Sequence, residues 1–240
     1  MKKHGRDHIS GFHDPLLIFG KKLLERVVVI GAGSHAQVVA DILLCMRNRG
    51  SPVEPIGFVD DDPHLAGKSR LGLPILGPIK SLADIPHDAV VIGIGDNATR
   101  AAIFERLRAA GGRFYNPIHP SAIVSPTARI GAGSVICAGV IIGVLVSIGD
   151  NVIVNTRATL EHHSTLGDHA HLGGGALGGG ELAIGPGAFI GMGATIVSGC
   201  RIGAWSFIGA ATLVFRDVPE RGKLLAVNKQ FKRYPAGTAA

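Results

Sequence analysis

The 240-residue sequence is poor in cysteine and aromatic residues, and it lacks long hydrophobic runs. Its three cysteines, Cys45, Cys137 and Cys200, are far apart and odd in number, which argues against a disulfide framework and is typical of a reducing compartment. The apolar run PLLIF at 15–19 is too short for the hydrophobic region of a signal peptide. No run approaches the roughly 18 apolar residues of a membrane span. We therefore predict a soluble, cytoplasmic protein that does not act on a membrane.

Composition and charge indicate the kind of hydrophobic core and the kind of binding partner. Hydrophobic residues make up 46% of the chain but aromatic residues only 5%, and there are 35 glycines, so the core should consist of short aliphatic side chains beside many tight turns. The net charge of +6 comes mainly from the two ends of the chain. There is no basic stripe interleaved with aromatic residues, so nucleic acid is not expected as a partner, and nucleotide phosphates suffice as the anion.

A period of six residues dominates the second half. Seventeen positions spaced by six run from Ile118 to Val214, and sixteen of them are Ile, Leu or Val, Gly178 being the exception. The residue four positions later is mostly small, and the residue directly after is glycine in ten cases. This is the signature of a parallel β-helix, in which each repeat supplies one short strand and one turn. Three repeats make one triangular coil, so residues 18 apart should stack in five to six coils.

The first half has a different pattern. VVVI at 27–30, the turn GAGSHAQ and an apolar run to Leu44 predict a strand, a glycine turn and a helix. PIGFV at 55–59 and AVVIGI at 89–94 predict further parallel strands, and a helix is expected from about Thr99 to Ala110. The ligand of such a sheet lies beyond the carboxyl ends of its strands.

The glycine turn favours a phosphate-bearing ligand. Gly31, Gly33 and Ala36 match G-x-G-x-x-A, and Asp60 ends the second strand, where an acid would bind a ribose. Only about 90 residues lie between the start of the first predicted strand and the repeats, which is enough for one mononucleotide half. We expect a nucleotide or nucleotide sugar at the helix N-terminus after Ser34; a dinucleotide and a purely structural turn are the alternatives.

GAGSHA, GFVDDD, GIGDN and NPIHPSA, followed by hexapeptide coils, resemble the PglD/NeuD family of sugar acetyltransferases. The resemblance spans residues 26 to about 220. It implies a half-Rossmann α/β domain followed by a left-handed β-helix, and a homotrimer with acetyl-CoA as co-substrate and no metal. We expect an N-terminal tail (1–24), a nucleotide-sugar-binding domain (25–116), a left-handed β-helix acyltransferase domain (117–218) and a C-terminal tail (219–240).

The resemblance also implies an activity and a base. PglD-like members acetylate the 4-amino group of a nucleotide-linked 4-amino-4,6-dideoxy sugar, as part of polysaccharide biosynthesis. The catalytic histidine of the family matches His162, in the segment Leu160-Glu161-His162 at a turn, so its ring should project outward. An amine that attacks a thioester must lose a proton, which a neutral imidazole can take. Asn155 is the candidate amide for the oxyanion.

One residue departs from the family pattern. His163 stands where PglD-like enzymes carry a carboxylate that raises the basicity of the base. Glu161 and Asp168 are the candidates to replace it, and a base without a helper is the alternative.

The other site residues come from the same resemblance. The positions that match acetyl-CoA contacts are His171, Gly180, Met192 and Ala210. The positions that match the sugar-nucleotide site are Gly33, Ser34, His35, Asp60, Asp61 and Gly95. His169 is expected at the surface. AVNKQ at 226–230 departs from the family's exit segment, although Lys229 could still meet a phosphate of CoA.

Three other functions remain open. An O-acetyltransferase of the NeuD type would use the same fold. A γ-carbonic anhydrase would hold zinc between subunits with three histidines, and His162, His163, His169 and His171 invite the comparison, but that reading leaves the front domain unused. The third is a non-enzymatic scaffold with a regulatory nucleotide domain. The sequence leaves the nucleotide, UDP or GDP, undecided.

Overall fold

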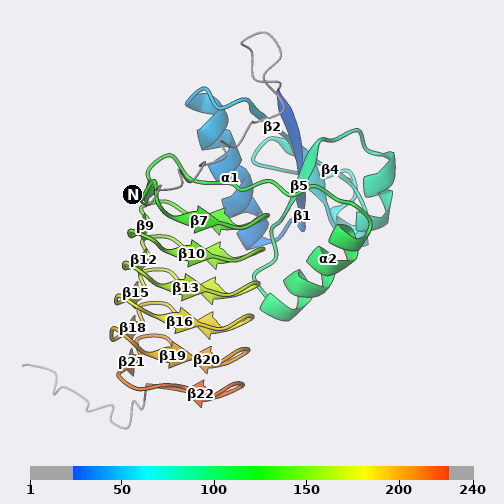
Figure 1. Cartoon of the computed structure of the whole chain (residues 1–240). Coiled ribbons are helices and arrows are strands. Elements are labelled where there is room, and N and C mark those ends of the chain that lie inside the picture. Colours follow the sequence, from blue (N-terminus) through cyan, green and yellow to red (C-terminus); the bar gives the residue numbers. More distant parts are fainter. Residues whose placement is uncertain (1–23, 227–240) are drawn as a thin grey trace, which may run out of the picture.

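The computed structural model describes residues 24–226, which form an α/β part followed by a prism of stacked short strands (Figure 1). Nearly all of the expected N-terminal tail, and Lys229 with most of the AVNKQ segment, lie outside the described residues. Within residues 24–226, no helix combines the length and the apolarity that crossing a bilayer requires.

The α/β part is built on one five-stranded sheet. Its strands lie in the order β3-β4-β2-β1-β5, and all neighbours are parallel except the pair β3 and β4. The predicted strands and helices are present, whereas β3 and β4 were not predicted. The bounds are β1 (Glu25–Ile30), α1 (Ser34–Asn48), β2 (Val53–Val59), β3 (Ser69–Arg70), β4 (Leu73–Gly77), β5 (Ala89–Ile92) and α2 (Asn97–Ala109), with 3-10 helices η1 (Pro63–Leu65) and η2 (Ile79–Asp84).

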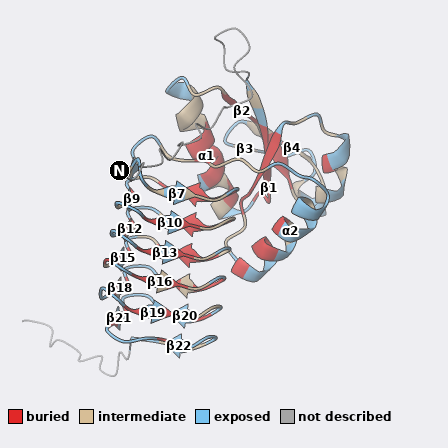
Figure 2. Cartoon of the chain, in the orientation of Figure 1, coloured by how far each residue is buried: buried red, intermediate tan, exposed pale blue. Residues whose placement is uncertain are grey.

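Alternation along β1 divides the core. Val27 and Val29 share a buried cluster with the inner side of α1, and this cluster continues into the interior of the prism. Val28 and Ile30 point the other way, into a second cluster with Phe104 of α2. Successive strand residues face opposite sides of a sheet, so both faces of this sheet are covered. Figure 2 shows the buried residues concentrated in β1 and β2 and along the strands of the prism.

The prism has three faces. Face 1 consists of β6 (Ile123–Val124), β9 (Ile141–Ile142), β12 (Thr159–Leu160), β15 (Leu177–Gly178), β18 (Thr195–Ile196) and β21 (Leu213–Val214). Face 2 consists of β7 (Arg129–Ile130), β10 (Ser147–Ile148), β13 (Thr165–Leu166), β16 (Ala183–Ile184) and β19 (Arg201–Ile202). Face 3 consists of β8 (Val135–Ile136), β11 (Ile153–Val154), β14 (His171–Leu172), β17 (Phe189–Ile190), β20 (Phe207–Ile208) and β22 (Lys223–Leu224).

The register confirms the parallel β-helix predicted from the six-residue period, whose left hand was implied by the family resemblance. Ile153 pairs with His171 and Thr159 with Leu177, each 18 residues apart. The aliphatic residue of each strand, such as Leu160 or Leu172, is buried inside the prism. At the exception, Gly178, a Cβ would lie 3.0 Å from Leu160 and from Leu182, so these two side chains already fill the space. The β-helix extends beyond the expected boundary at Val218, because Lys223 still pairs with Phe207.

The turns form three corners, named here by the faces they join: corner 1–2, corner 2–3 and corner 3–1. Glycine follows the aliphatic residue because the next coil is close: a Cβ on Gly143 would lie 2.8 Å from the backbone nitrogen of His162. Positive φ occurs two residues later in the turn, for example 57° at His163. The glycines that directly follow the aliphatic residues are therefore explained by the close approach of the next coil rather than by positive φ.

Arg100 of α2 joins the two parts. Its side chain is 1% exposed, and its guanidinium donates to the carbonyls of Ile94 and Gly95 in one part and of Asn151, His169 and Ala170 in the other. It also donates to Oδ1 of Asn97, whose amide nitrogen reaches the carbonyl oxygens of Gly187 and Ala188. The bonds to Asn151, His169 and Ala170 cross from α2 to corner 2–3, and the bonds to Ile94 and Gly95 fix the guanidinium within its own domain. Arg100 therefore holds the nucleotide-type domain against the prism.

Candidate functional site

All six residues predicted for the sugar nucleotide line one cavity of about 460 Å³ at the carboxyl ends of β1, β2 and β5. The cavity also includes Thr99 and Ile103 of α2 and Ile79 of η2, which sequence reasoning had not selected. Elements far apart in sequence meet here because the carboxyl ends of parallel strands share one edge of the sheet.

The glycine turn leaves the start of α1 open. Gly33 is the residue before the helix, and a Cβ on it would meet nothing within 4 Å. No side chain caps this helix end and its first turn carries no acidic residue. Ala36 completes the motif for a packing reason, since a Cβ on Gly93 would come within 2.5 Å of the Ala36 Cα. An uncapped helix N-terminus facing a cavity can bind a phosphate.

Asp60 and Asp61 accept hydrogen bonds from the backbone that surrounds the cavity. Asp60 accepts from the backbone nitrogens of Ala32 (2.7 Å) and Asp62 (2.9 Å), and Asp61 accepts from that of Ile79 (2.8 Å). A carboxylate has about four lone-pair sites, so both acids retain acceptor capacity for a ribose or a base.

His35 and His171 meet where the cavity adjoins face 3. Their ring centroids are 6.3 Å apart, and the Asn155 amide donates to Nε2 of His171 (3.3 Å). Among the described residues, neither Nε2 of His35 nor Nδ1 of His171 has a hydrogen-bond partner, and both atoms are buried. Burial lowers the pKa of His35 to about 4 and that of His171 to about 3, and the Arg100 charge acts in the same direction. Both rings are therefore neutral at neutral pH.

These two pKa values predict acid sensitivity. The folded-state pKa lies below the ordinary value of 6.5, so the unfolded chain binds more protons and the free energy of unfolding should fall as pH decreases from about 6.5 towards 4. Each pKa unit corresponds to about 1.4 kcal/mol. We expect thermal melts to show a falling Tm across this window, with a shallower fall in His35→Gln. Asp88 and Asp96, whose pKa values lie below 3.8, lose their contribution only at lower pH. A Tm independent of pH between 7 and 4.5 would contradict the prediction.

His162 projects from corner 1–2, as predicted, and is exposed to solvent together with Glu161 and His163. Its ring lies over Gly180, one coil further on, where a Cβ would be 2.6 Å from Cε1 and 2.8 Å from Nε2. Its Nδ1 lies 3.1 Å from Nδ1 of His163. Gly180, which the resemblance assigned to acetyl-CoA, thus also provides the space that the imidazole occupies.

Gly180→Ala should move that ring. Because the ring is exposed, it can swing away with little cost to stability, so we expect an unchanged Tm but a kcat lower by about ten- to a hundredfold, the usual cost of a misplaced catalytic group. Gly174→Ala is the matched control, since its Cβ would come no closer than 3.5 Å to any atom. Equal kcat values in the two variants would refute the positioning role of Gly180.

The predicted residues fall at separate edges of the prism. Glu161, His162 and Gly180 lie on corner 1–2, whereas Asn155, Met192 and Ala210 lie on corner 3–1 and His171 on face 3 between the other two corners. The nucleotide-type cavity adjoins face 3 through His35. Within one chain, corner 1–2 is therefore the corner opposite the face that carries His171.

Two expectations need correction. His169 is not a surface residue: its side chain is 12% exposed, and its ring contacts Asn151 (2.9 Å) and Glu105 (3.3 Å) between corner 2–3 and α2. Burial lowers its pKa. Asp168 lies on corner 2–3, where it accepts from the backbone nitrogen of Asp150 (2.8 Å), so within the chain it does not serve His162. Among residues 24–226, no three potential metal ligands gather in one place.

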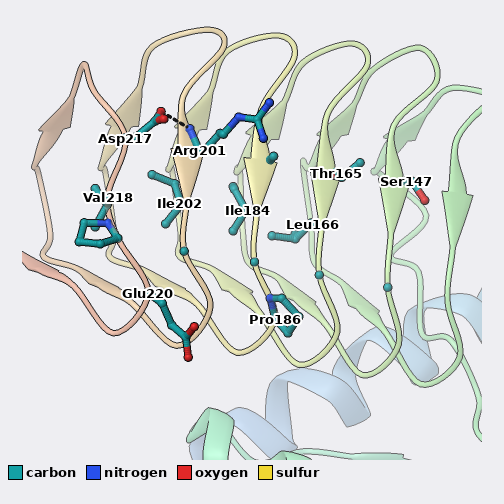
Figure 3. A pocket seen from close by; sticks show the side chains of 16 residues that line it. Ser147, Thr165, Leu166, Ile184, Pro186, Arg201, Ile202, Asp217, Val218 and Glu220 are labelled. Atoms are coloured by element: carbon teal, nitrogen blue, oxygen red, sulfur yellow. Dashed lines mark hydrogen bonds between the residues drawn. The ribbon is translucent and has the colours of Figure 1, made fainter.

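A hollow of about 820 Å³ lies along face 2 (Figure 3). It is shallow because the outward residues Ser147, Thr165 and Ala183 are small, and at one end Asp217 accepts from the backbone nitrogen of Arg201 (2.8 Å). None of the predicted site residues lines it. The size of this hollow therefore does not identify it as the catalytic site.

Comparisons with known proteins agree with this architecture. The model of the PglD N-terminal domain family matches residues 26–107. UDP-N-acetylbacillosamine N-acetyltransferase from Bacillus subtilis (strain 168) is 35% identical over 116 residues, 46% of this chain, and the match spans half the length of that curated relative.

Solved structures match over a greater length. The acetyltransferase domain of PglB from Neisseria gonorrhoeae FA1090 is 31% identical with a TM-score of 0.79, covering 84% of this chain and 97% of that domain. PerB from Caulobacter crescentus, in complex with CoA and GDP-perosamine, is 36% identical with a TM-score of 0.76, covering 86% and 97%. Identity at this level over nearly the whole of both relatives, together with the family-model match to the first domain, shows that the chain belongs to the PglD-like family of sugar N-acetyltransferases.

Proposed function

We propose that this protein transfers the acetyl group of acetyl-CoA to the 4-amino group of a nucleotide-linked 4-amino-4,6-dideoxy sugar, with His162 as general base and direct attack on the thioester. The observation that carries the proposal is the single cavity that contains Gly33, Ser34, His35, Asp60, Asp61 and Gly95 beside an uncapped helix N-terminus. PerB, a relative matched over 97% of its chain, is seen in complex with CoA and GDP-perosamine.

The chemistry follows from the groups available. The amine nitrogen attacks the thioester carbonyl, a C–N bond forms, the C–S bond breaks, and His162 takes the proton that the nitrogen loses while CoA leaves as its thiolate. Asn155 donates one amide hydrogen to His171 and has a second one, which can stabilise the developing oxyanion. The neutral ring of His171, adjoining His35, belongs to the acetyl-CoA side of the site.

We further propose that the enzyme works as a homotrimer, with the site shared between copies. The nucleotide cavity adjoins face 3 of the prism, whereas His162 lies on the opposite corner of the same chain, so a neighbouring copy would supply the base. Face 1 carries a ladder of exposed apolar side chains, Ile123 (65%), Ile141 (42%), Leu177 (46%) and Leu213 (57%). Thr159 and Thr195 occupy the intervening strands β12 and β18, and an exposed face on which apolar side chains recur in this way favours burial against another chain.

The direct test is acetyl transfer itself. The purified protein is incubated with acetyl-CoA and either a UDP- or a GDP-linked 4-amino-4,6-dideoxy sugar, and released CoA thiol is measured. We expect rapid release with one of the amines and little with the 4-hydroxy counterpart. Faster release with the hydroxyl sugar would indicate an O-acetyltransferase, and no release with any acceptor would contradict the proposal.

Thermal shift with free nucleotides identifies the nucleotide independently. A ligand at a hundred times its Kd should stabilise the protein by about 2.7 kcal/mol.

A further inference from the structure

The two adjacent histidines on corner 1–2 are in direct contact. Nδ1 of His162 lies 3.1 Å from Nδ1 of His163, with the rings nearly perpendicular at 82° and their centroids 5.2 Å apart. His163 has φ of 57°, a conformation that histidine adopts more readily than most residues. On its other side the His162 ring covers Gly180. The imidazole is therefore confined between a backbone surface and a second imidazole.

A contact between two Nδ1 atoms at this distance needs a single proton between them. Two donors would repel each other, and two acceptors would have no hydrogen to share, so one ring donates and the other accepts. If His162 donates, its Nε2 carries a lone pair and can take a proton. If His163 donates, Nε2 of His162 carries the hydrogen and His162 cannot act as a base. The direction of this hydrogen bond decides whether the base works.

We propose that His163 is a positioning residue: its neutral ring accepts from Nδ1–H of His162 and thereby keeps the Nε2 lone pair of His162 available to the incoming amine. The catalytic consequence rests on the proposed function, whereas the tautomer does not. His163 thus takes the place of the carboxylate that the resemblance led us to expect. When His162 becomes an imidazolium, Nδ1–H remains a donor and the bond strengthens, because hydrogen bonds from charged donors are stronger.

The surroundings agree with this role. Arg216, a cation on the same corner, lies three coils beyond His162. Within one coil of His162, the other ionisable groups on corner 1–2 are Glu161, next to His162, and Glu181, one coil beyond His163. Both are carboxylates, so neither opposes the formation of an imidazolium at His162.

Nitrogen NMR of the full-length protein tests the tautomer without any substrate. In protein labelled with 15N-histidine, two-bond proton–nitrogen correlations distinguish Nδ1–H from Nε2–H, and the His162 signals are assigned by their loss in His162→Gln. We expect the Nδ1–H form of His162 in the wild type and a shift to Nε2–H in His163→Leu. Finding Nε2–H in the wild type overturns the proposal, whatever the protein acetylates.

Kinetics test the consequence. His163→Leu should lower kcat by about ten- to a hundredfold with little change in KM, and His163→Glu, which restores an acceptor, should recover most of the loss. Leu145→Ala, at the equivalent turn position one coil earlier, is the control and should leave kcat unchanged. Wild-type kcat in His163→Leu, or equal loss in the Leu and Glu variants, overturns the positioning role. Absence of acetyl transfer in the wild type would refute the proposed function but leave the NMR result valid.

Discussion

Replacing His162 by alanine should lower kcat for acetyl transfer by roughly 10²- to 10⁴-fold, the usual contribution of a positioned general base. The ring is exposed and rests on a glycine, so its removal leaves no cavity and should not change the Tm. In the proposed site His162 faces the amine of the sugar rather than the nucleotide, so the affinity for the free nucleotide, measured by calorimetry, should also be unchanged. The expected result is thus a loss confined to kcat, measured as the rate of CoA thiol release at saturating substrates.

His64→Ala is the matched control, because His64 is likewise an exposed histidine but lies in the 3-10 helix η1. It should have wild-type kcat and Tm. A His162→Ala variant with wild-type kcat would exclude this histidine as the base and favour the scaffold interpretation.

Mixing two inactive variants should restore activity if the site is shared between copies. The partner of His162→Ala in this experiment is Gly33→Leu. A Cβ at Gly33 would meet no protein atom within 4 Å, and Gly33 lines the nucleotide cavity, so we expect the fold to tolerate leucine there while the cavity is blocked. In a trimer assembled at random from equal amounts of both chains, a site is intact only when the base comes from a Gly33→Leu chain and the cavity from a His162→Ala chain. That occurs in about a quarter of sites, given the equivalent interfaces of a symmetric ring.

The measurement is acetyl transfer by the co-expressed pair compared with each variant alone. About a quarter of wild-type kcat is expected for the mixture, against near-zero values for the single variants. Only residual activity in the mixture, with co-purification of the untagged variant through an affinity tag on the other confirming mixed trimers, would show that one chain supplies both the base and the cavity.

The repeat pattern alone was sufficient to predict the prism. Six-residue spacing of aliphatic residues predicts strands stacked 18 residues apart, and each pairing follows because an isolated repeat cannot bury its apolar residue. The turn position of His162 and its outward ring follow from the same count. Local motifs likewise predicted β1, α1, β2, β5 and α2, since glycine turns and apolar runs are short-range signals.

Contacts between distant segments were not predictable in this way. Arg100 is one of several arginines in α2, and no periodicity marks it as the residue that is 1% exposed and bound to carbonyls 51 to 70 residues away. His169 was expected at the surface for the same reason, because the helix that covers it comes from another part of the chain. Strands β3 and β4 were missed because two- to five-residue strands carry little pattern of their own.

What the sequence by itself determined was the list of residues: the repeat register, the glycine turn, the acids after β2, and the histidines of residues 162–171. What only the tertiary structure decided was which of them meet. His35 and His171, far apart in sequence, lie side by side, and burial lowers the pKa of each ring. His162 and His171, only nine residues apart, lie at opposite sides of the prism. The physical reason is that a coil of 18 residues turns through a full circle, so proximity within the prism depends on position around the coil and on which domain packs against that side.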